Sequence, residues 1–253
     1  MPLVTTPALV LHVMPYGETS KILRLLTRDL GLQSAIARGA RRKKARTGPR
    51  LDLFAAGTAT LLTKGTRELN PLTEFEASNA HAGLAHDVTR FAAASALAEL
   101  ALKCAPADPH AEVFEAALAG LDAIERAPAD VADTAALAAC WGLVVALGFE
   151  PVLDRCAVCG TPLEGALPFS AAQGGVLCGT HRGGHGVTKL AEPDRAALAA
   201  LLEGRLPDPP LDPRHAAAHR RLLLAFIRHH LAEHRALPAL AFWDAEAWNA
   251  TSS

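Results

Sequence analysis

The 253-residue sequence predicts an α+β fold in which a small N-terminal β-barrel precedes an all-helical domain that carries a short inserted module. Three observations favour this fold class. Short apolar runs alternate with turn residues as far as residue 75, a pattern typical of strands. From residue 76 onward, apolar residues recur every three or four positions, as in amphipathic helices. Four residues that commonly bind metal ions then lie close together between two helical stretches.

The N-terminal part is predicted to contain five short strands, with turn residues at 15–17, 29–31 and 64–65. Five strands in so short a segment favour a small closed or partly open barrel. The OB-fold is the commonest nucleic-acid-binding barrel of this kind, and we therefore expect it here. The strands are expected at residues 8–13, 20–27, 32–37, 57–62 and 68–75.

Apolar periodicity predicts several helices in the rest of the chain. Residues 135–147 are apolar on almost every side, as expected for the central helix of a bundle. The last long helix is expected to turn its charged groups outward and five apolar residues inward, namely Leu222, Leu223, Phe226, Ile227 and Leu231. Helices are expected around residues 91–101, 113–121, 135–147, 192–202 and 215–235.

Two pairs of metal-ligand residues, Cys156-x2-Cys159 and Cys178-x2-His181, are separated by 18 residues. This is the spacing of a zinc ribbon, in which two tight turns direct four side chains at one tetrahedral Zn²⁺ ion. The alternative is two unrelated pairs of buried thiols. His185 competes with His181 for the fourth position, so the fourth ligand stays open.

A zinc site filled by four Cys and His ligands has no position for a substrate water, so the predicted Zn²⁺ has a structural role. The sequence also lacks a phosphate-binding glycine-rich loop with a following Lys, and it lacks a nucleophile elbow. His230 and His234 have the spacing of a two-histidine metal site, but a polar helix face is the preferred interpretation. No catalytic residue is predicted, and the chain is expected not to be an enzyme.

Cysteine usage and hydropathy indicate a cytoplasmic protein. Three of the five cysteines belong to the metal-ligand window, which fits a reducing compartment better than a disulfide scaffold. The N-terminus lacks a signal-peptide pattern. The longest uncharged run, residues 134–149, is too short to cross a bilayer, so no membrane association is expected.

The net charge of −1 conceals an asymmetry between the two parts of the chain. Residues 1–76 contain 12 Lys and Arg against 6 Asp and Glu, whereas residues 77–253 contain 13 against 20. Within the first part, residues 38–50 hold seven cations and no acid. Such a loop favours binding of nucleic-acid phosphates, although a merely solubilising loop is the alternative.

The DNA-binding residues are predicted from this charge pattern. Lys21 and Arg24 extend the basic loop, with Arg28, Lys64 and Arg67 as further candidates. Because the barrel offers only Tyr16, Phe54 and Phe75 as aromatic surfaces, binding is expected to be mostly electrostatic and weakly selective between single and double strands. The predicted DNA-binding set is Lys21, Arg24, Arg38, Arg41, Arg42, Lys43, Lys44, Arg46 and Arg50.

Several sequence motifs resemble the RecO family of bacterial recombination mediators. The run from Val10 to Ser20, continued at 25–27 and 37–41, is similar to the N-terminal family pattern. Residues 147–153, leading into the first cysteine pair, are similar to a second family motif. The likeness covers essentially the whole chain. The family commonly has a fourth Cys where this chain has His181.

The resemblance implies a protein of DNA repair and homologous recombination in the RecF pathway. Such proteins bind single- and double-stranded DNA and anneal complementary strands. They engage the C-terminal tail of the single-stranded-DNA-binding protein, and with RecR they assist RecA loading. It also implies a functional link to RecF and a location at the nucleoid.

A partner peptide is expected on the apolar helical body. Arg220, Arg221 and Arg228 are candidates for that contact, although a solvated helix face is preferred for them. A zinc-ribbon transcription regulator and a zinc hydrolase are the competing functions. The expected domains are residues 1–77 (OB-fold, DNA-binding), 78–150 with 191–253 (helical) and 151–190 (zinc ribbon).

Overall fold

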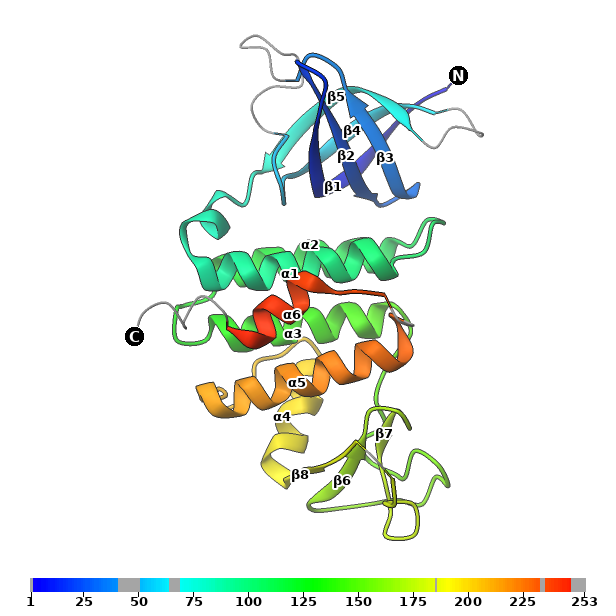
Figure 1. The fold of residues 1–253 in the computed structure, drawn as a ribbon, viewed down its shortest axis with the longest axis vertical. Coiled ribbons are helices and arrows are strands. Elements are labelled where there is room, and N and C mark those ends of the chain that lie inside the picture. Colours follow the sequence, from blue (N-terminus) through cyan, green and yellow to red (C-terminus); the bar gives the residue numbers. More distant parts are fainter. Residues whose placement is uncertain (1, 41–50, 64–68, 185, 233–234, 247–253) are drawn as a thin grey trace.

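The structure is a computed structural model that describes residues 2–40, 51–63, 69–184, 186–232 and 235–246. The molecule is elongated, with a β-barrel at one end, a layer of helices in the middle and a small sheet at the other end (Figure 1). The predicted α+β fold class is therefore confirmed. Among the described residues, no helix is long and apolar enough to cross a membrane.

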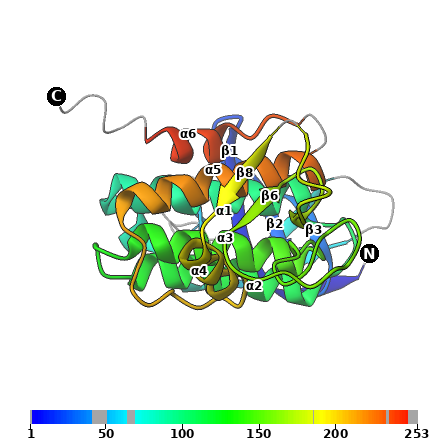
Figure 2. The same cartoon turned by 90° about the horizontal axis from the view of Figure 1, so that it is seen from below.

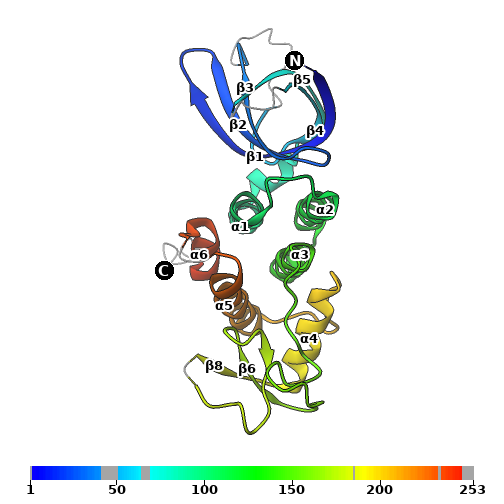
Figure 3. The ribbon, with the colours of Figure 1, turned by 90° about the vertical axis from the view of Figure 1, so that its right-hand side faces the viewer.

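The barrel is closed by five strands in the order β1-β2-β3-β5-β4, with β4 pairing back to β1. Its one parallel contact joins β3 to β5, and the other neighbours are antiparallel. Figure 3 shows this ring of strands end-on. The strands are β1 (Leu3–Tyr16), β2 (Ser20–Thr27), β3 (Gly31–Ala37), β4 (Ala56–Leu62) and β5 (Asn70–Asn79).

Each predicted strand overlaps one of these strands, but β1 begins five residues earlier and ends three residues later than expected (3 and 16 against 8 and 13). The reason is that β1 closes the barrel. Its first half pairs with β4, from Leu3 to Leu9, and its second half pairs with β2, from Ala8 to Tyr16. A strand shared by two neighbours in succession must be long enough for both.

The helical body lies directly beneath the barrel, with α1 and α2 side by side against it (Figure 3). The buried face of α3 includes Leu137, Trp141 and Val144, which confirms its predicted central position. The body consists of the 3₁₀ helix η1 (Ala82–His86) and of α1 (Val88–Cys104), α2 (Ala111–Arg126), α3 (Ala132–Ala146), α4 (Glu192–Leu202), α5 (Pro213–His230) and α6 (Pro238–Ala245).

The prediction for the last long helix is wrong at its C-terminal end. Helix α5 stops at His230 rather than at 235, and both Leu231 and Ala232 direct their N–H groups at the carbonyl of Ile227. Three of the five expected core positions, Leu223, Phe226 and Ile227, are buried as predicted, whereas Leu222 and Leu231 are only partly buried. The chain then forms the unpredicted short helix α6, which packs on α1 and α5.

The interpretation of Arg220 as part of a solvated helix face is also wrong. Arg220 is only 3% exposed and forms ion pairs with Asp133 and Glu246. The indole Nε1 of Trp243 donates to the same Asp133 at 3.1 Å, so α6 supplies part of the cover over this side of α5. Arg221 and Arg228, by contrast, are exposed as expected.

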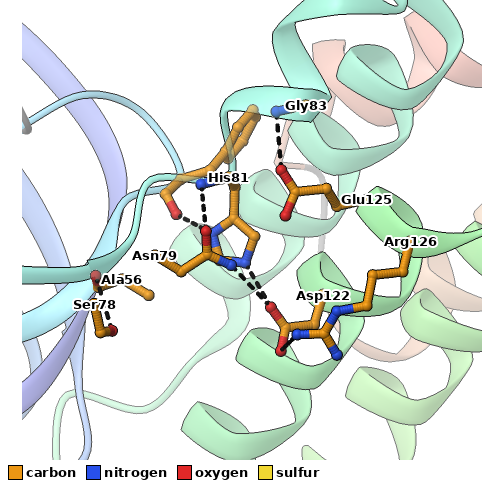
Figure 4. A network of polar contacts seen from close by, with 9 residues as sticks. Ala56, Ser78, Asn79, His81, Gly83, Asp122, Glu125 and Arg126 are labelled. Atoms are coloured by element: carbon orange, nitrogen blue, oxygen red, sulfur yellow. Dashed lines mark hydrogen bonds and ion pairs between the residues drawn. The ribbon is translucent and has the colours of Figure 1, made fainter.

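A buried histidine joins the barrel to the helical body (Figure 4). His81 follows β5 in a left-handed backbone conformation (φ 46°) and is 2% exposed. Its Nδ1 lies 2.8 Å from the carbonyl oxygen of Phe54, and its Nε2 lies 2.9 Å from Oδ1 of Asp122 on α2. The ring therefore bridges a carbonyl oxygen of the barrel and a carboxylate of the helical body.

The neighbours of His81 strengthen this junction. Asn79 accepts from the His81 N–H and donates to Asp122, while Glu125 accepts from the N–H of Gly83 (Figure 4). Phe54 also packs edge-on against Phe91 of α1, with ring centroids 5.6 Å apart. Polar and apolar contacts therefore both fix the barrel on the helices.

The small sheet at the far end has the order β7-β6-β8, formed by β6 (Leu167–Ser170), β7 (Gly175–Val176) and β8 (Val187–Leu190). Figure 2 views the molecule from this end, with the sheet in front of the helices. Val152 bridges to Gly175, where an added Cβ would lie 2.3 Å from the Val152 carbonyl oxygen. Glycine is thus required at 175 by this close approach.

Candidate metal centre and nucleic-acid interface

The two predicted metal-ligand pairs come together at the far end of the molecule. One ligand atom from each of Cys156, Cys159, Cys178 and His181 lies within 4.8 Å of all the others. The competing residue His185 lies outside the described residues. Two backbone turns aim the side chains: the Gly160 N–H donates to the Cys156 carbonyl at 2.8 Å, and the His181 N–H donates to that of Cys178 at 3.1 Å.

The spacing of the ligand atoms fits a tetrahedral site. With zinc–sulfur bonds of about 2.3 Å and zinc–nitrogen bonds of about 2.0 Å, tetrahedral S–S and S–N separations are roughly 3.8 Å and 3.5 Å. Cys159 Sγ and Cys178 Sγ are 3.9 Å apart, and His181 Nδ1 lies 3.6 Å from Cys156 Sγ and 3.2 Å from Cys178 Sγ. The cluster could therefore hold a metal ion.

The protonation chemistry of the cluster suits a metal as well. Burial alone would raise the pKa of the Cys156 thiol, but hydrogen bonds from the backbone of Cys159, Cys178 and Val158 outweigh it and lower that pKa to about 6. A thiolate is the form of cysteine that binds metals. Hydrogen bonding to Cys156 raises the pKa of His181, so a metal ion would have to displace a proton from this ring, because only the neutral imidazole binds metals.

The module around the cluster is packed into the main hydrophobic core. Leu167, Phe169 and Val176 are buried in the same cluster as the helices. His230 of α5 also contacts the carbonyl oxygen of Ala171 at 2.7 Å through Nε2. An ion at the cluster would therefore stabilise a module on which α4 and α5 rest.

The predicted DNA-binding residues lie partly in the described barrel. Lys21 Nζ donates to the Leu51 carbonyl and to Asp52, and Arg24 donates to Ser34 at 2.7 Å. Arg38 is exposed and has no hydrogen bond or ion pair among the described residues. Arg41, Arg42, Lys43, Lys44, Arg46 and Arg50 lie outside the described residues, as do Lys64 and Arg67.

Arg28, a further candidate, is engaged within the protein. It pairs with Asp29 and with Glu115 of α2, so it helps to attach the barrel to the helices. Of the cations in the described barrel, Arg38 is thus the one whose guanidinium has no partner in the described residues.

Sequence reasoning missed two depressions. One lies at the barrel surface beside Arg38 and includes the exposed ring of Tyr16. The other is an apolar groove of about 430 Å³ between α2 and α3, lined mainly by alanine and glycine and including Arg126. The small residues that repeat along both helices were a signal for this groove. Gly120, where a Cβ would lie 2.7 Å from Leu97 Cδ2, is one of them.

The protein thus consists of an OB-like barrel packed on a helical body that carries a Cys/His module, and this combination of parts defines its structural class. Family models cover nearly all of it: "Recombination protein O N terminal" matches residues 1–81, and "Recombination protein O C terminal" matches residues 85–238. The chain therefore belongs to the RecO family of DNA repair proteins, which confirms the resemblance seen in the sequence.

Curated relatives agree with this assignment. The chain is 36% identical over 241 residues to the DNA repair protein RecO of Anaeromyxobacter sp. (strain K), covering 93% of both proteins. It is 33% identical over 224 residues to that of Synechococcus sp. (strain JA-3-3Ab), covering 85% of this chain and 73% of the relative. The protein of Rhodopirellula baltica is 38% identical over 177 residues, covering 68% and 64%.

Proposed function

We propose that this protein is a recombination mediator of the RecF pathway. In this role it binds single- and double-stranded DNA, anneals complementary strands and, with RecR, assists loading of RecA onto DNA coated by the single-stranded-DNA-binding protein. The family match over both parts of the chain is the observation that carries the proposal. The alternatives of a transcription regulator and a hydrolase gain no support from that match.

Annealing in this scheme requires charge neutralisation and proximity rather than covalent chemistry, so the protein is not an enzyme. The cations at 38–50 reduce the repulsion between two phosphate backbones held near one barrel. If roughly 4–6 phosphates are neutralised, log K should fall against log salt concentration with a slope of about −3 to −5.

The metal in this proposal is a structural Zn²⁺ held by Cys156, Cys159, Cys178 and His181. When bound, it would cross-link the two turns that carry these ligands. The three sulfurs and one nitrogen form a donor set typical of structural zinc sites. Because all four positions are filled by protein ligands, the ion would contribute to folding and not to a reaction.

Partner docking is proposed at the groove between α2 and α3. Its apolar lining suits the hydrophobic end of a peptide. Arg126 pairs with Asp122 at 3.0 Å, but its side chain is largely exposed and could also contact an acidic residue or a terminal carboxylate of the peptide. The C-terminal tail of the single-stranded-DNA-binding protein has this chemistry. A functional link to RecF and a place in the cytoplasm at the nucleoid belong to the same proposal.

The domain division that accompanies this function assigns DNA binding to residues 1–77. Residues 78–150 and 191–253 form the partner-binding helical domain, and residues 151–190 form the metal module. The last barrel strand, β5, ends at Asn79, so the barrel extends two residues beyond the first of these proposed boundaries.

The test is annealing of complementary oligonucleotides without ATP, followed by fluorescence energy transfer between end labels. Changing Arg41, Arg42, Lys43 and Lys44 to Glu should slow annealing at least tenfold and flatten the salt slope. A matched control changes four exposed cations outside the barrel, Lys189 of β8 and Arg214, Arg221 and Arg228 of α5, to Glu. If both variants anneal like the unaltered protein, the basic loop is not the DNA-binding element.

A further inference from the structure

A depression of about 720 Å³ opens on the barrel where four segments meet. These segments are the β1–β2 hairpin, the end of β3, the two residues that follow it, and the start of β5. Its volume lies in the range of small-molecule binding pockets. Among the described residues, its lining holds no acidic side chain and consists of Tyr16, Thr19, Ser20, Ile36, Arg38, Gly39, Leu69 and Pro71.

The aromatic ring of Tyr16 is exposed, unlike the other aromatic rings of the barrel. It is 55% exposed, whereas Phe54 and Phe75, the other aromatic residues of the barrel, are 3% and 6% exposed. Its hydroxyl has no hydrogen bond among the described residues. The hairpin holds its backbone in place, since Tyr16 pairs with Ser20 across a turn in which Gly17 has a φ of 56°. The ring is thus displayed to solvent from a fixed position.

Arg38 provides the positive charge in the same depression. Lys21, Arg24 and Arg28 all have protein partners, but Arg38 has none among the described residues. An exposed guanidinium beside an exposed aromatic ring, with the Thr19 and Ser20 hydroxyls nearby, is the combination that binds an unpaired nucleotide. The ring offers a face for a base, and the guanidinium offers donors for a phosphate.

We propose that this depression binds one unpaired nucleotide of a single-stranded nucleic acid. The base lies on the ring of Tyr16, and the adjacent phosphate is bound by Arg38. Thr19 and Ser20 also line the depression, and their hydroxyls form hydrogen bonds with the sugar or with the edge of the base. Since a paired base in a duplex has both faces covered, the site selects single strands, which the basic loop alone does not do.

The inference deepens the proposed function and rests on it. Arg38 and Gly39 immediately precede the run of cations in the sequence, so a strand bound by that run is delivered next to the depression. For a mediator, such a site distinguishes DNA that still needs a partner strand from DNA that is already paired.

The sequence supplies a selective probe for this site. It contains one tyrosine, so replacing tyrosine by 3-fluorotyrosine in the full-length protein gives a single fluorine resonance that reports on Tyr16 alone. A dT12 oligonucleotide should shift this resonance in a saturable manner, with the midpoint given by fluorescence anisotropy of the same oligonucleotide. Three ligands at equal concentration serve as comparisons. A twelve-residue abasic strand tests whether the base is needed, a matched duplex tests whether the base must be unpaired, and thymidine monophosphate tests whether a free nucleotide is sufficient.

The expected result is a shift with dT12 that is at least several times larger than with the abasic strand or the duplex. An equal shift with the abasic strand would show that only the backbone contacts the site. An equal shift with the free nucleotide at the same concentration would show a mononucleotide site. Either result overturns the inference. If dT12 binds by anisotropy but the resonance is unmoved, the inference fails while the proposed function stands. If no strand binds by anisotropy, both fail.

Substitutions give a second measurement. Tyr16→Ala should weaken dT12 binding about tenfold, Tyr16→Phe should leave it within about twofold, and neither should change duplex binding. Leu3→Ala is the matched control, because Leu3 is a similarly exposed apolar residue at the other end of β1 (62% against 55%). Equal losses of single-strand and duplex affinity in Tyr16→Ala would contradict base stacking.

Discussion

The junction between barrel and helices offers the sharpest test of the fold. We expect His81→Asn to destabilise the protein by about 3 kcal/mol, because the shorter side chain cannot reach both acceptors. A hydrogen bond to a charged group contributes about 1.5–3 kcal/mol, and one to a carbonyl contributes about 0.5–1.5 kcal/mol. His81 makes one of each, to Asp122 at 2.9 Å and to the Phe54 carbonyl at 2.8 Å.

Asparagine is the suitable replacement because it tolerates the left-handed backbone conformation that residue 81 adopts. The measured loss then reports the side-chain bonds and not backbone strain. The assay is urea unfolding followed by circular dichroism and by tryptophan fluorescence. His86→Asn is the control, since His86 is an exposed histidine five residues away on η1 and should change stability by less than about 0.5 kcal/mol. Equal stability of the two variants would refute the reasoning.

Three further outcomes are expected. Cys156→Ser should lower the zinc content measured by mass spectrometry and reduce the melting temperature, whereas Cys104→Ser should leave zinc unchanged; full zinc in the first variant would count against the site. Arg220→Ala should lower the free energy of unfolding by about 3–5 kcal/mol, because it leaves two carboxylates without their buried partner. The control Arg221→Ala, at an exposed position, should lower it by less than about 0.5 kcal/mol in the same urea titration. Burial raises the pKa of Cys140 to about 12, so iodoacetamide at pH 8 should modify it only after unfolding, and mass-spectrometric detection of native labelling would argue against this burial.

Local patterns in the sequence were sufficient for the elements that depend on local spacing. The metal ligands were found because a two-residue gap fixes each pair on one turn, and the structure brings both pairs within 4.8 Å. Whether the cluster binds zinc stays a prediction. The limits of β2 were predicted to the residue, since its apolar run coincides with one pairing segment between two turns.

Features that join distant segments could not be predicted in this way. Arg220 reads as one charge among several on a polar helix face, but its partners Asp133 and Glu246 are 87 and 26 residues away. Its burial depends on α6, which has too few residues to show a clear period. The depression at Tyr16 likewise combines four segments, and only their arrangement in the barrel makes the tyrosine distinctive.

The positions of the metal module and the barrel also predict which function is impaired first when the metal is lost. The metal module and the barrel lie at opposite ends of the long axis, with the helices between them (Figure 1). Helix α4 follows the module directly, Arg195 of α4 donates to the Leu153 carbonyl at 3.0 Å, and the residues after α4 supply Gly204 and Leu206 to the groove between α2 and α3. Loss of the metal should therefore impair partner docking before it impairs strand annealing, because only the groove includes a segment that the module holds in place.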